Sequence, residues 1–327
     1  MRNKAYNFPY ESVFSEDIRN YVNLKQSMGL LFKTPASNLR RFDRLCSQLK
    51  IEHPILTEEL ISRWISPIDG ESASTRIARI TALKGFAEYL NANGKPTKWP
   101  AVRQKYNNQV QFVPYIFTAD EITRIFEISD SLEMSKRGSQ FHLIFPAILR
   151  VLYGTGLRIS EVLSLQYDDV DLEKGLLKVW NSKFDNSRYV PISNSLQQAL
   201  FSYNNRLCSP KRKYFFPNPK GEPYSQRTVY DKFRVVLWRC RISHGGCRKG
   251  PRVHDLRHTF AVHSLQKCER AGLDTYLFLP ILATYLGHKK VSTTEKYLRL
   301  TAEAFPIFLE KATDLSDYLI PGVPSDE

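Results

Sequence analysis

The residues best suited to chemistry lie between positions 253 and 300. The segment opens with the sequence HDLRH, in which His254 and Arg257 are one helical turn apart and can face the same point. His288 follows in a Leu-Gly-His sequence, and Tyr297 comes shortly after it. A tyrosine hydroxyl beside histidine and arginine side chains can attack a phosphate and hold the product covalently. The alternative interpretation is a half-buried core aromatic surrounded by hydrogen-bonded histidines.

Two further cations that suit this chemistry lie upstream. Arg158 follows a Gly-Thr-Gly turn, and Lys183 lies in a hairpin loop between two β-rich runs, 176–180 and 188–192. A guanidinium donates to two phosphate oxygens, and a lysine on a mobile hairpin can protonate a leaving oxygen. Because side chains would supply the positive charge, such phosphoryl transfer needs no metal or other cofactor.

The charge of the chain indicates a polyanionic partner. The net charge is +14 over 327 residues; the first 110 residues hold 17 Lys and Arg against 10 Asp and Glu, and the rest hold 30 against 23. Each part is therefore +7, which favours nucleic acid bound by two basic domains. A membrane surface is the weaker alternative, because no segment is apolar for long enough to span a bilayer. A regulator unrelated to DNA is disfavoured by the same charge.

Cysteine content and the chain start predict a cytoplasmic protein. Five cysteines argue against a disulfide scaffold, and the start MRNKAYNFPYESVF is not a signal peptide. Four residues lie close enough in sequence to raise a metal site: Cys240, His244, Cys247 and His254. No CxxC pair occurs, and the two glycines between them indicate a turn, so we expect no metal there.

Residues 1–93 are predicted to form a helical domain. Ser15, Ser37, Thr57 and about Ser74 mark helix starts before apolar residues at helical spacing, and Gly94 has the place of a C′ glycine. Five arginines lie off the apolar faces: Arg40, Arg41, Arg44, Arg76 and Arg79. Together they are interpreted as a surface that contacts DNA phosphates, whereas for any single one a solvated helix face is the preferred interpretation.

The remaining chain is predicted to be a basic linker followed by a second domain. Residues 94–117 contain three prolines and little periodicity, and a capping box from Thr118 to Glu121 begins the domain 118–327. A second capping box, Ser292 with Glu295, places Tyr297 on the second turn of a helix. The other expected elements are helices at 119–129, 140–153 (interrupted at Pro146), 157–163, 195–207, 225–241 and 303–319, and a third strand at 214–216. The fold class is mainly α with a small antiparallel β-sheet.

The sequence resembles the tyrosine recombinases, also called the phage integrase or λ-integrase-like family. Three motifs occur in the family's order: TGLRISEVLSL (155–165), HDLRHTFAVH (254–263) and YLGHKKVSTTEKY (285–297); KFDNSRYVPI (183–192) matches more loosely. The resemblance implies an α+β catalytic domain, with residues 1–93 as a helical core-binding domain of the SAM-like type.

The resemblance also implies a role for each matching residue. Arg158 and Arg257 would clamp the non-bridging oxygens of the scissile phosphate, and His288 would hydrogen-bond the phosphate. Tyr297 would be the nucleophile that forms a 3′-phosphotyrosine and frees a 5′-hydroxyl. His254 would accept or share the proton of that nucleophile.

Other matching residues are less direct. Lys183 would protonate the leaving oxygen, but the family's hairpin usually has glycines around this lysine, so Lys178 stays an alternative. His258 is interpreted as making a structural hydrogen bond, and Glu161 as orienting the turn of Arg158.

The resemblance implies double-stranded DNA as the partner, with four protomers on two duplexes, alone or with a second recombinase. The absence of room for an arm-site domain and a longer stretch before His288 favour a mobile-element integrase or transposase. The helix at 303–319 would dock onto a neighbouring protomer or pack on its own domain. Two rival functions remain: a DNA-binding accessory protein without catalysis, and a type IB topoisomerase.

Overall fold

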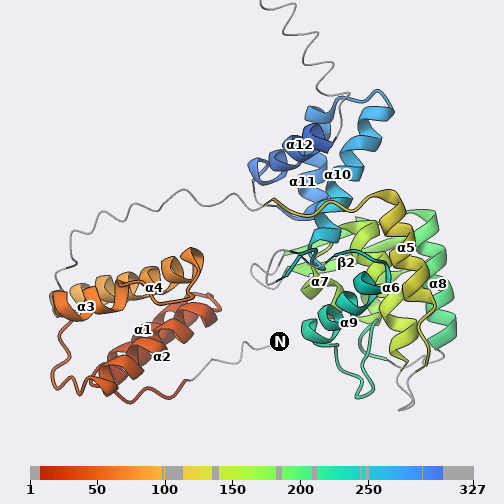
Figure 1. Cartoon of the computed structure of the whole chain (residues 1–327). Coiled ribbons are helices and arrows are strands. Elements are labelled where there is room, and N and C mark those ends of the chain that lie inside the picture. The colour runs from red at the N-terminus through yellow and green to blue at the C-terminus, as the bar shows by residue number, and fades with distance from the viewer. Residues whose placement is uncertain are drawn as a thin grey trace, which may run out of the picture. The chain divides into compact units, whose positions relative to one another are not determined.

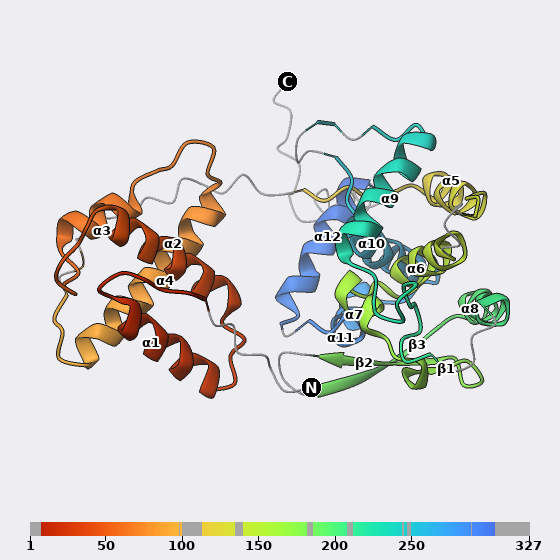
Figure 2. The same cartoon turned by 90° about the horizontal axis from the view of Figure 1, so that it is seen from below.

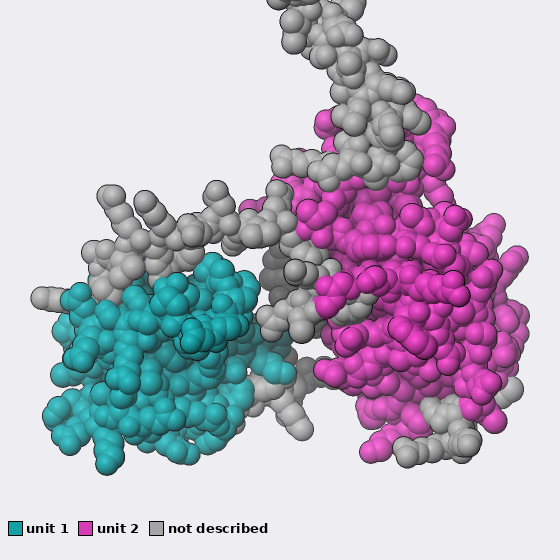
Figure 3. Space-filling view, in the orientation of Figure 1, with its two compact units in different colours: residues 1–112 teal, residues 113–327 magenta. Residues whose placement is uncertain are grey.

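The computed structural model describes residues 8–97, 99, 113–134, 140–181, 186–207, 212–243, 245–246, 250–288 and 290–304. The chain divides into two compact units, Met1–Phe112 and Val113–Glu327, which Figure 3 shows in separate colours. Within these ranges, no helix is both long enough and apolar enough to cross a membrane.

The first unit consists of helices: α1 (Ser15–Ser27), α2 (Lys33–Gln48), α3 (Glu58–Ile65) and α4 (Ala73–Ala92). Thr57 caps α3 as predicted, since its hydroxyl accepts from the Leu60 N–H. Helix α4 begins one residue before the predicted Ser74, because Ser72 is its N-cap. Gly94 follows α4 with φ +75°, the left-handed conformation that a C′ glycine supplies.

The starts of α1 and α2 were predicted wrongly. The N-cap of α1 is Phe14, so Ser15 is the first helical residue and not the cap. The Phe14 N–H donates to the Ser12 hydroxyl. Helix α2 begins at Lys33, before the predicted Ser37, because the first turn of a helix tolerates Pro35.

The second unit contains a small sheet, eight α-helices and one 3-10 helix (Tyr167–Asp169) in the described ranges, as Figures 1 and 2 illustrate. The helices are α5 (Ala119–Asp130), α6 (Phe141–Thr155), α7 (Ile159–Ser164), α8 (Asn194–Leu207), α9 (Gln226–Arg239), α10 (Asp255–Arg270), α11 (Thr275–Leu286) and α12 (Ser292–Ala304). The strands are β1 (Val170–Asp171), β2 (Leu176–Asn181) and β3 (Asn186–Pro191). The mainly helical fold with a small antiparallel sheet is confirmed.

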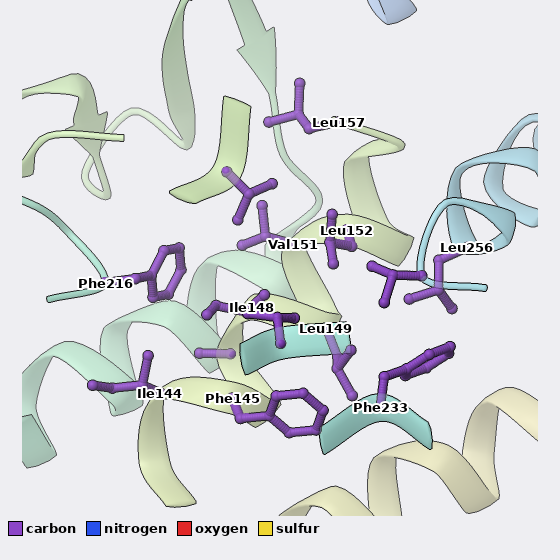
Figure 4. Close-up of a cluster of buried hydrophobic side chains, with 14 of the residues drawn as sticks. Ile144, Phe145, Ile148, Leu149, Val151, Leu152, Leu157, Phe216, Phe233 and Leu256 are labelled. Atoms are coloured by element: carbon purple, nitrogen blue, oxygen red, sulfur yellow. The ribbon is translucent and has the colours of Figure 1, made fainter. Parts of the chain in front are cut away.

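Helix α6 is the centre of the second unit's core. It contacts α5, α7, α8 and α10, and lies between α5 and α8 in Figure 2. Its buried side chains meet Phe216, Phe233 and Leu256 in the cluster of Figure 4. The predicted interruption at Pro146 is wrong, since the helix runs through this buried residue. Packing on several sides can outweigh the hydrogen bond that proline removes.

The sheet is antiparallel in the order β1-β2-β3. Leu177 pairs with Val190 and Val179 with Arg188, so these residues share one face, whose apolar members are buried. Lys178 therefore lies on the opposite face. The predicted third strand at 214–216 is wrong: Tyr214 makes only an isolated bridge, and the third strand is β1.

Helices α10, α11 and α12 pack around a second, smaller apolar cluster that includes Leu265, Leu282, Leu286 and Tyr297. Tyr297 lies on the second turn of α12, as predicted. Residues 303–304 belong to α12 and do not begin a new helix, and the rest of the predicted helix at 303–319 lies outside the described residues.

Candidate active site

Arg257 joins three separate segments of the second unit. Its side chain is 2% exposed. Nη1 donates to the Gly156 carbonyl at 2.6 Å, and Nη2 donates to the Leu286 carbonyl and to His288 Nε2, both at 2.8 Å. Burial and the nearby Arg158 lower the pKa of Arg257 to about 10, so the guanidinium still carries its charge at neutral pH.

The turn of Gly156 allows Arg257 to reach the end of α6. Gly156 has φ +62°, and a Cβ there would lie 2.5 Å from Phe260 Cδ1 and 2.8 Å from Leu286 Cδ2. Only glycine fits this conformation and this space. The glycine of the TGLR motif therefore positions both its own carbonyl and the Arg158 that follows.

His288 is held in one tautomer. Its Nε2 accepts from Arg257, which has only donors, so Nδ1 carries the proton and donates to Thr294 Oγ1 at 2.8 Å. Thr294 is fully buried in the first turn of α12. Burial, with Arg257 and Arg158, lowers the pKa of His288 to about 4, and the ring is neutral at pH 7.

Arg158 stands at the N-terminus of α7, with its side chain 40% exposed. Its backbone N–H and Nη1 both bind the Glu161 carboxylate, at 2.9 and 3.0 Å. Burial opposes ionisation of Glu161, but hydrogen bonds from Arg188 and from the Arg158 backbone outweigh it and lower the pKa. The carboxylate therefore orients the Arg158 turn, in line with the interpretation from sequence.

Tyr297 is directed into this cluster. It is 5% exposed, its hydroxyl lies 3.1 Å from His258 Nδ1, and its ring stacks on His288 with centroids 6.2 Å apart. Burial raises the pKa of the hydroxyl, against the effect of Arg257 and Arg158. The tyrosine is thus both a member of the apolar cluster and a partner of the polar one, so the two interpretations from sequence are compatible.

Two more histidines complete the cluster. His254 precedes α10 and packs edge-to-face on His258, with ring centroids 4.8 Å apart. Desolvation and neighbouring charges, chiefly Arg257 for His254 and His254 for His258, lower the pKa of His254 to about 4 and that of His258 to about 3. Both rings are therefore neutral at pH 7. The structure brings together five of the predicted residues: Arg158, His254, Arg257, His288 and Tyr297.

Lys183, the sixth predicted residue, lies outside the described residues. The alternative, Lys178, lies with its ammonium 4.3 Å from the ring centre of Trp180, on the face of the sheet opposite to Arg188. Because Arg188 contacts Glu161 in the cluster, Lys178 faces away from it. This geometry disfavours Lys178, and Lys183 stays a prediction.

One of the five predicted DNA-contacting arginines is buried. Arg79 is 0% exposed, and it binds Glu71 through Nε and Nη2 at 2.8 Å and the Ser66 carbonyl through Nη2. Its predicted phosphate contact is therefore wrong, because the ion pair with Glu71 uses the guanidinium inside the helical unit. Arg76 is half-buried and donates to the Ile65 carbonyl at 3.0 Å, whereas Arg41 and Arg44 are exposed and Arg40 is half-buried.

Three residues make contacts in the site that the sequence did not predict. His258 contacts the Tyr297 hydroxyl itself, Thr294 accepts a hydrogen bond from His288, and Arg188 binds Glu161. Arg188 and Thr294 both lie within the quoted motifs, so the motifs contain them without indicating their contacts. In the described ranges, no group of three His, Cys, Asp or Glu side chains could hold a metal ion, and two of the four candidate ligands, His244 and Cys247, lie outside those ranges.

Comparison with known proteins gives the family of the chain. The model of the phage integrase family matches residues 116–304. The Sinorhizobium fredii protein y4rE, whose name describes it as a candidate integrase/recombinase, is 30% identical over 91% of this chain and 95% of its own length. Tyrosine recombinase XerA of Pyrococcus furiosus is 29% identical over 80% of this chain and 82% of its own.

A solved structure shows the same fold. The lambda integrase tetramer bound to a Holliday junction aligns with a TM-score of 0.61 and 17% identity, covering 86% of this chain and 76% of that one. The chain belongs to the phage integrase family. It is a tyrosine recombinase, an enzyme that cuts and rejoins DNA at specific sites.

Proposed function

We propose that Tyr297 cuts one DNA strand by attacking its phosphate, forming a 3′-phosphotyrosine and releasing a 5′-hydroxyl. The observation that carries this proposal is the position of the Tyr297 hydroxyl, which contacts His258 and lies beside Arg257 and His288. The bond from phosphorus to the 5′-oxygen breaks as the bond to the tyrosine oxygen forms. Attack by a 5′-hydroxyl from another strand reverses this step and reseals the DNA, so no external energy source is needed.

Arg158, Arg257 and His288 hold the phosphate in this proposal. Two guanidiniums neutralise the charge that develops on the non-bridging oxygens. In the free protein His288 Nε2 accepts a hydrogen bond from Arg257, so it must gain a proton or change tautomer before it can donate to the phosphate. A bound phosphate favours that proton, because its negative charge offsets the arginines that lower the pKa of His288.

Two proton transfers accompany the cut. The Tyr297 proton passes to a neutral histidine: His254 by the family resemblance, with His258 as the nearer acceptor at 3.1 Å. The 5′-oxygen takes a proton from Lys183. The leaving strand would otherwise depart as an alkoxide, and a positioned acid of this kind typically contributes about 10²–10⁴-fold in rate.

The proposal extends to the whole chain. Residues 1–93 form a DNA-binding domain that uses Arg40, Arg41 and Arg44, and the basic segment 94–117 links it to the catalytic domain. Four protomers act on two double-stranded DNA sites in the cytoplasm, to integrate, excise or transpose a mobile element. Support comes from the +14 net charge, from the exposed Arg41 and Arg44, and from the tetrameric lambda integrase complex.

The test first identifies the DNA site and then measures recombination between two copies of it. The wild-type chain is incubated with fragmented genomic DNA, protein-linked ends are captured, and their sequences define the site and the stagger. Two copies of that site on one plasmid should then recombine. Relaxation of supercoils without a defined site or any joined product would instead identify a type IB topoisomerase.

A further inference from the structure

Near the site, Arg188 of β3 makes four side-chain hydrogen bonds that have no role in the proposed mechanism. Its guanidinium donates to the Tyr285 carbonyl at 3.1 Å, to both oxygens of Glu161 at 3.2 and 3.1 Å, and to the Leu286 carbonyl at 3.4 Å. We propose that Arg188 is a positioning residue that fixes Arg158 and His288 relative to each other before DNA binds. This inference rests on the proposed roles of those two residues.

The first contact acts through Glu161. Glu161 Oε1 accepts from Nη1 of both Arg158 and Arg188, at 3.0 and 3.2 Å. Arg188 therefore occupies part of the carboxylate that Arg158 could otherwise bind in a two-pronged pair. With Arg188 in place, Arg158 holds the carboxylate through one side-chain nitrogen, and its side chain remains 40% exposed.

The second contact acts on the end of α11. The last carbonyls of a helix lack hydrogen-bond donors within the helix. Here the Tyr285 carbonyl accepts from Arg188, and the Leu286 carbonyl accepts from both Arg188 and Arg257. Gly287 follows with φ +69°, and a Cβ there would lie 2.8 Å from Arg188 Cζ. His288 is the next residue, so Arg188 supports the backbone turn from which this side chain extends.

The side-chain contacts of Arg188 differ from those of Arg158. Nε, Nη1 and Nη2 of Arg188 all donate to protein acceptors, and the side chain is only 17% exposed. Arg158 has the opposite character, because it is more exposed and holds Glu161 with one side-chain nitrogen. Loss of Arg188 should therefore slow the chemistry and change affinity for DNA little.

The experiment measures covalent adduct formation and DNA affinity separately, using the full chain and the DNA site recovered as above. Arg188→Gln should form the Tyr297–DNA adduct about 10–100-fold more slowly at saturating DNA, the range expected when a reacting group is misplaced, with Kd little changed. Arg188→Lys, which can reach only some of the acceptors, should fall between. Arg150→Gln is the matched control, since it removes an arginine bound to Asp130 at 2.6 Å in the same unit.

A second readout needs no cleavage. In the DNA-free protein, the imidazole NMR signal of His288 should shift in Arg188→Gln and stay in place in Arg150→Gln. Wild-type adduct rates in Arg188→Gln, or a loss of affinity that accounts for the whole rate defect, would overturn the proposal. So would an unchanged His288 signal in a folded variant. Failure of the wild-type chain to form any Tyr297 adduct would instead refute the proposed function, and the NMR comparison would still decide the role of Arg188.

Discussion

At the scale of single residues, the site is a cluster of neutral histidines between charged arginines. The pKa values of His254, His258 and His288 are lowered to between about 3 and 4 by burial and by the guanidiniums around them. The free protein thus has fixed positive charge for a phosphate and neutral bases for a tyrosine proton. The motifs predicted the residue types, but they could not predict that His258 meets the Tyr297 hydroxyl, because that contact depends on how α12 packs on α10.

Two arginines of the helical unit should behave in opposite ways. Arg79→Met leaves the Glu71 carboxylate, which is 6% exposed, without its cation and should cost about 3–5 kcal/mol of stability in urea unfolding. Arg41→Met removes an exposed charge, so it should change stability by less than about 0.5 kcal/mol while lowering DNA affinity. A stable Arg79→Met protein with weakened DNA binding would contradict the structural role of Arg79 and support its predicted contact with DNA. Sequence spacing could not separate these arginines, since the partner of Arg79 comes from the loop before α4.

At the scale of elements, the site is built where helix ends meet. The end of α6, the start of α7, the start of α10 and the end of α11 converge, and Arg257 donates to two of those ends. Helices with clear apolar spacing and caps, such as α3 and α5, could be predicted from the sequence. The course of α6 through Pro146 and the two-residue strand β1 could not, because tertiary contacts and not local signals decide them.

Gly156 tests how tightly these ends are packed. Gly156→Ala forces a side chain into a left-handed conformation and against Phe260 and Leu286, so it should cost about 2–4 kcal/mol in urea unfolding. Gly221→Ala shares the positive φ but meets nothing within 4 Å, so it should cost only about 1–2 kcal/mol. Equal losses in the two variants would contradict the close packing at the end of α6.

The two candidate lysines should respond differently to substitution. Lys183→Ala should slow adduct formation by about 10²–10⁴-fold, the loss expected for a general acid. Lys178→Ala changes a residue on the face away from Glu161 and should leave the rate nearly unchanged. The reverse pattern would identify Lys178 as the acid and contradict the orientation of β2.

At the scale of the whole molecule, the buried histidines make stability depend on pH. Their folded pKa values lie below the unfolded value of about 6.5, so between pH 6.5 and 4 the unfolded chain binds more protons than the folded one. Stability should therefore fall as pH decreases through this window, by at most about 1.4 kcal/mol per pH unit for each histidine. Urea midpoints at pH 7, 6 and 5 measure this, and His258→Gln should flatten the slope. A stability independent of pH in this range would contradict the neutral cluster.

Both units carry the positive charge that DNA requires, a property that the sequence predicts from composition alone.

The central claim is that Tyr297 forms the covalent bond to DNA. A duplex nicked near the recovered cleavage site tests this claim most directly. Cleavage releases a short strand that diffuses away, so the DNA cannot be resealed and the covalent complex accumulates. The wild-type chain should form an adduct whose modified peptide contains Tyr297, and Tyr297→Phe should bind the same duplex with similar Kd and form none. A persisting adduct in Tyr297→Phe, or a wild-type adduct on another residue, would contradict the account.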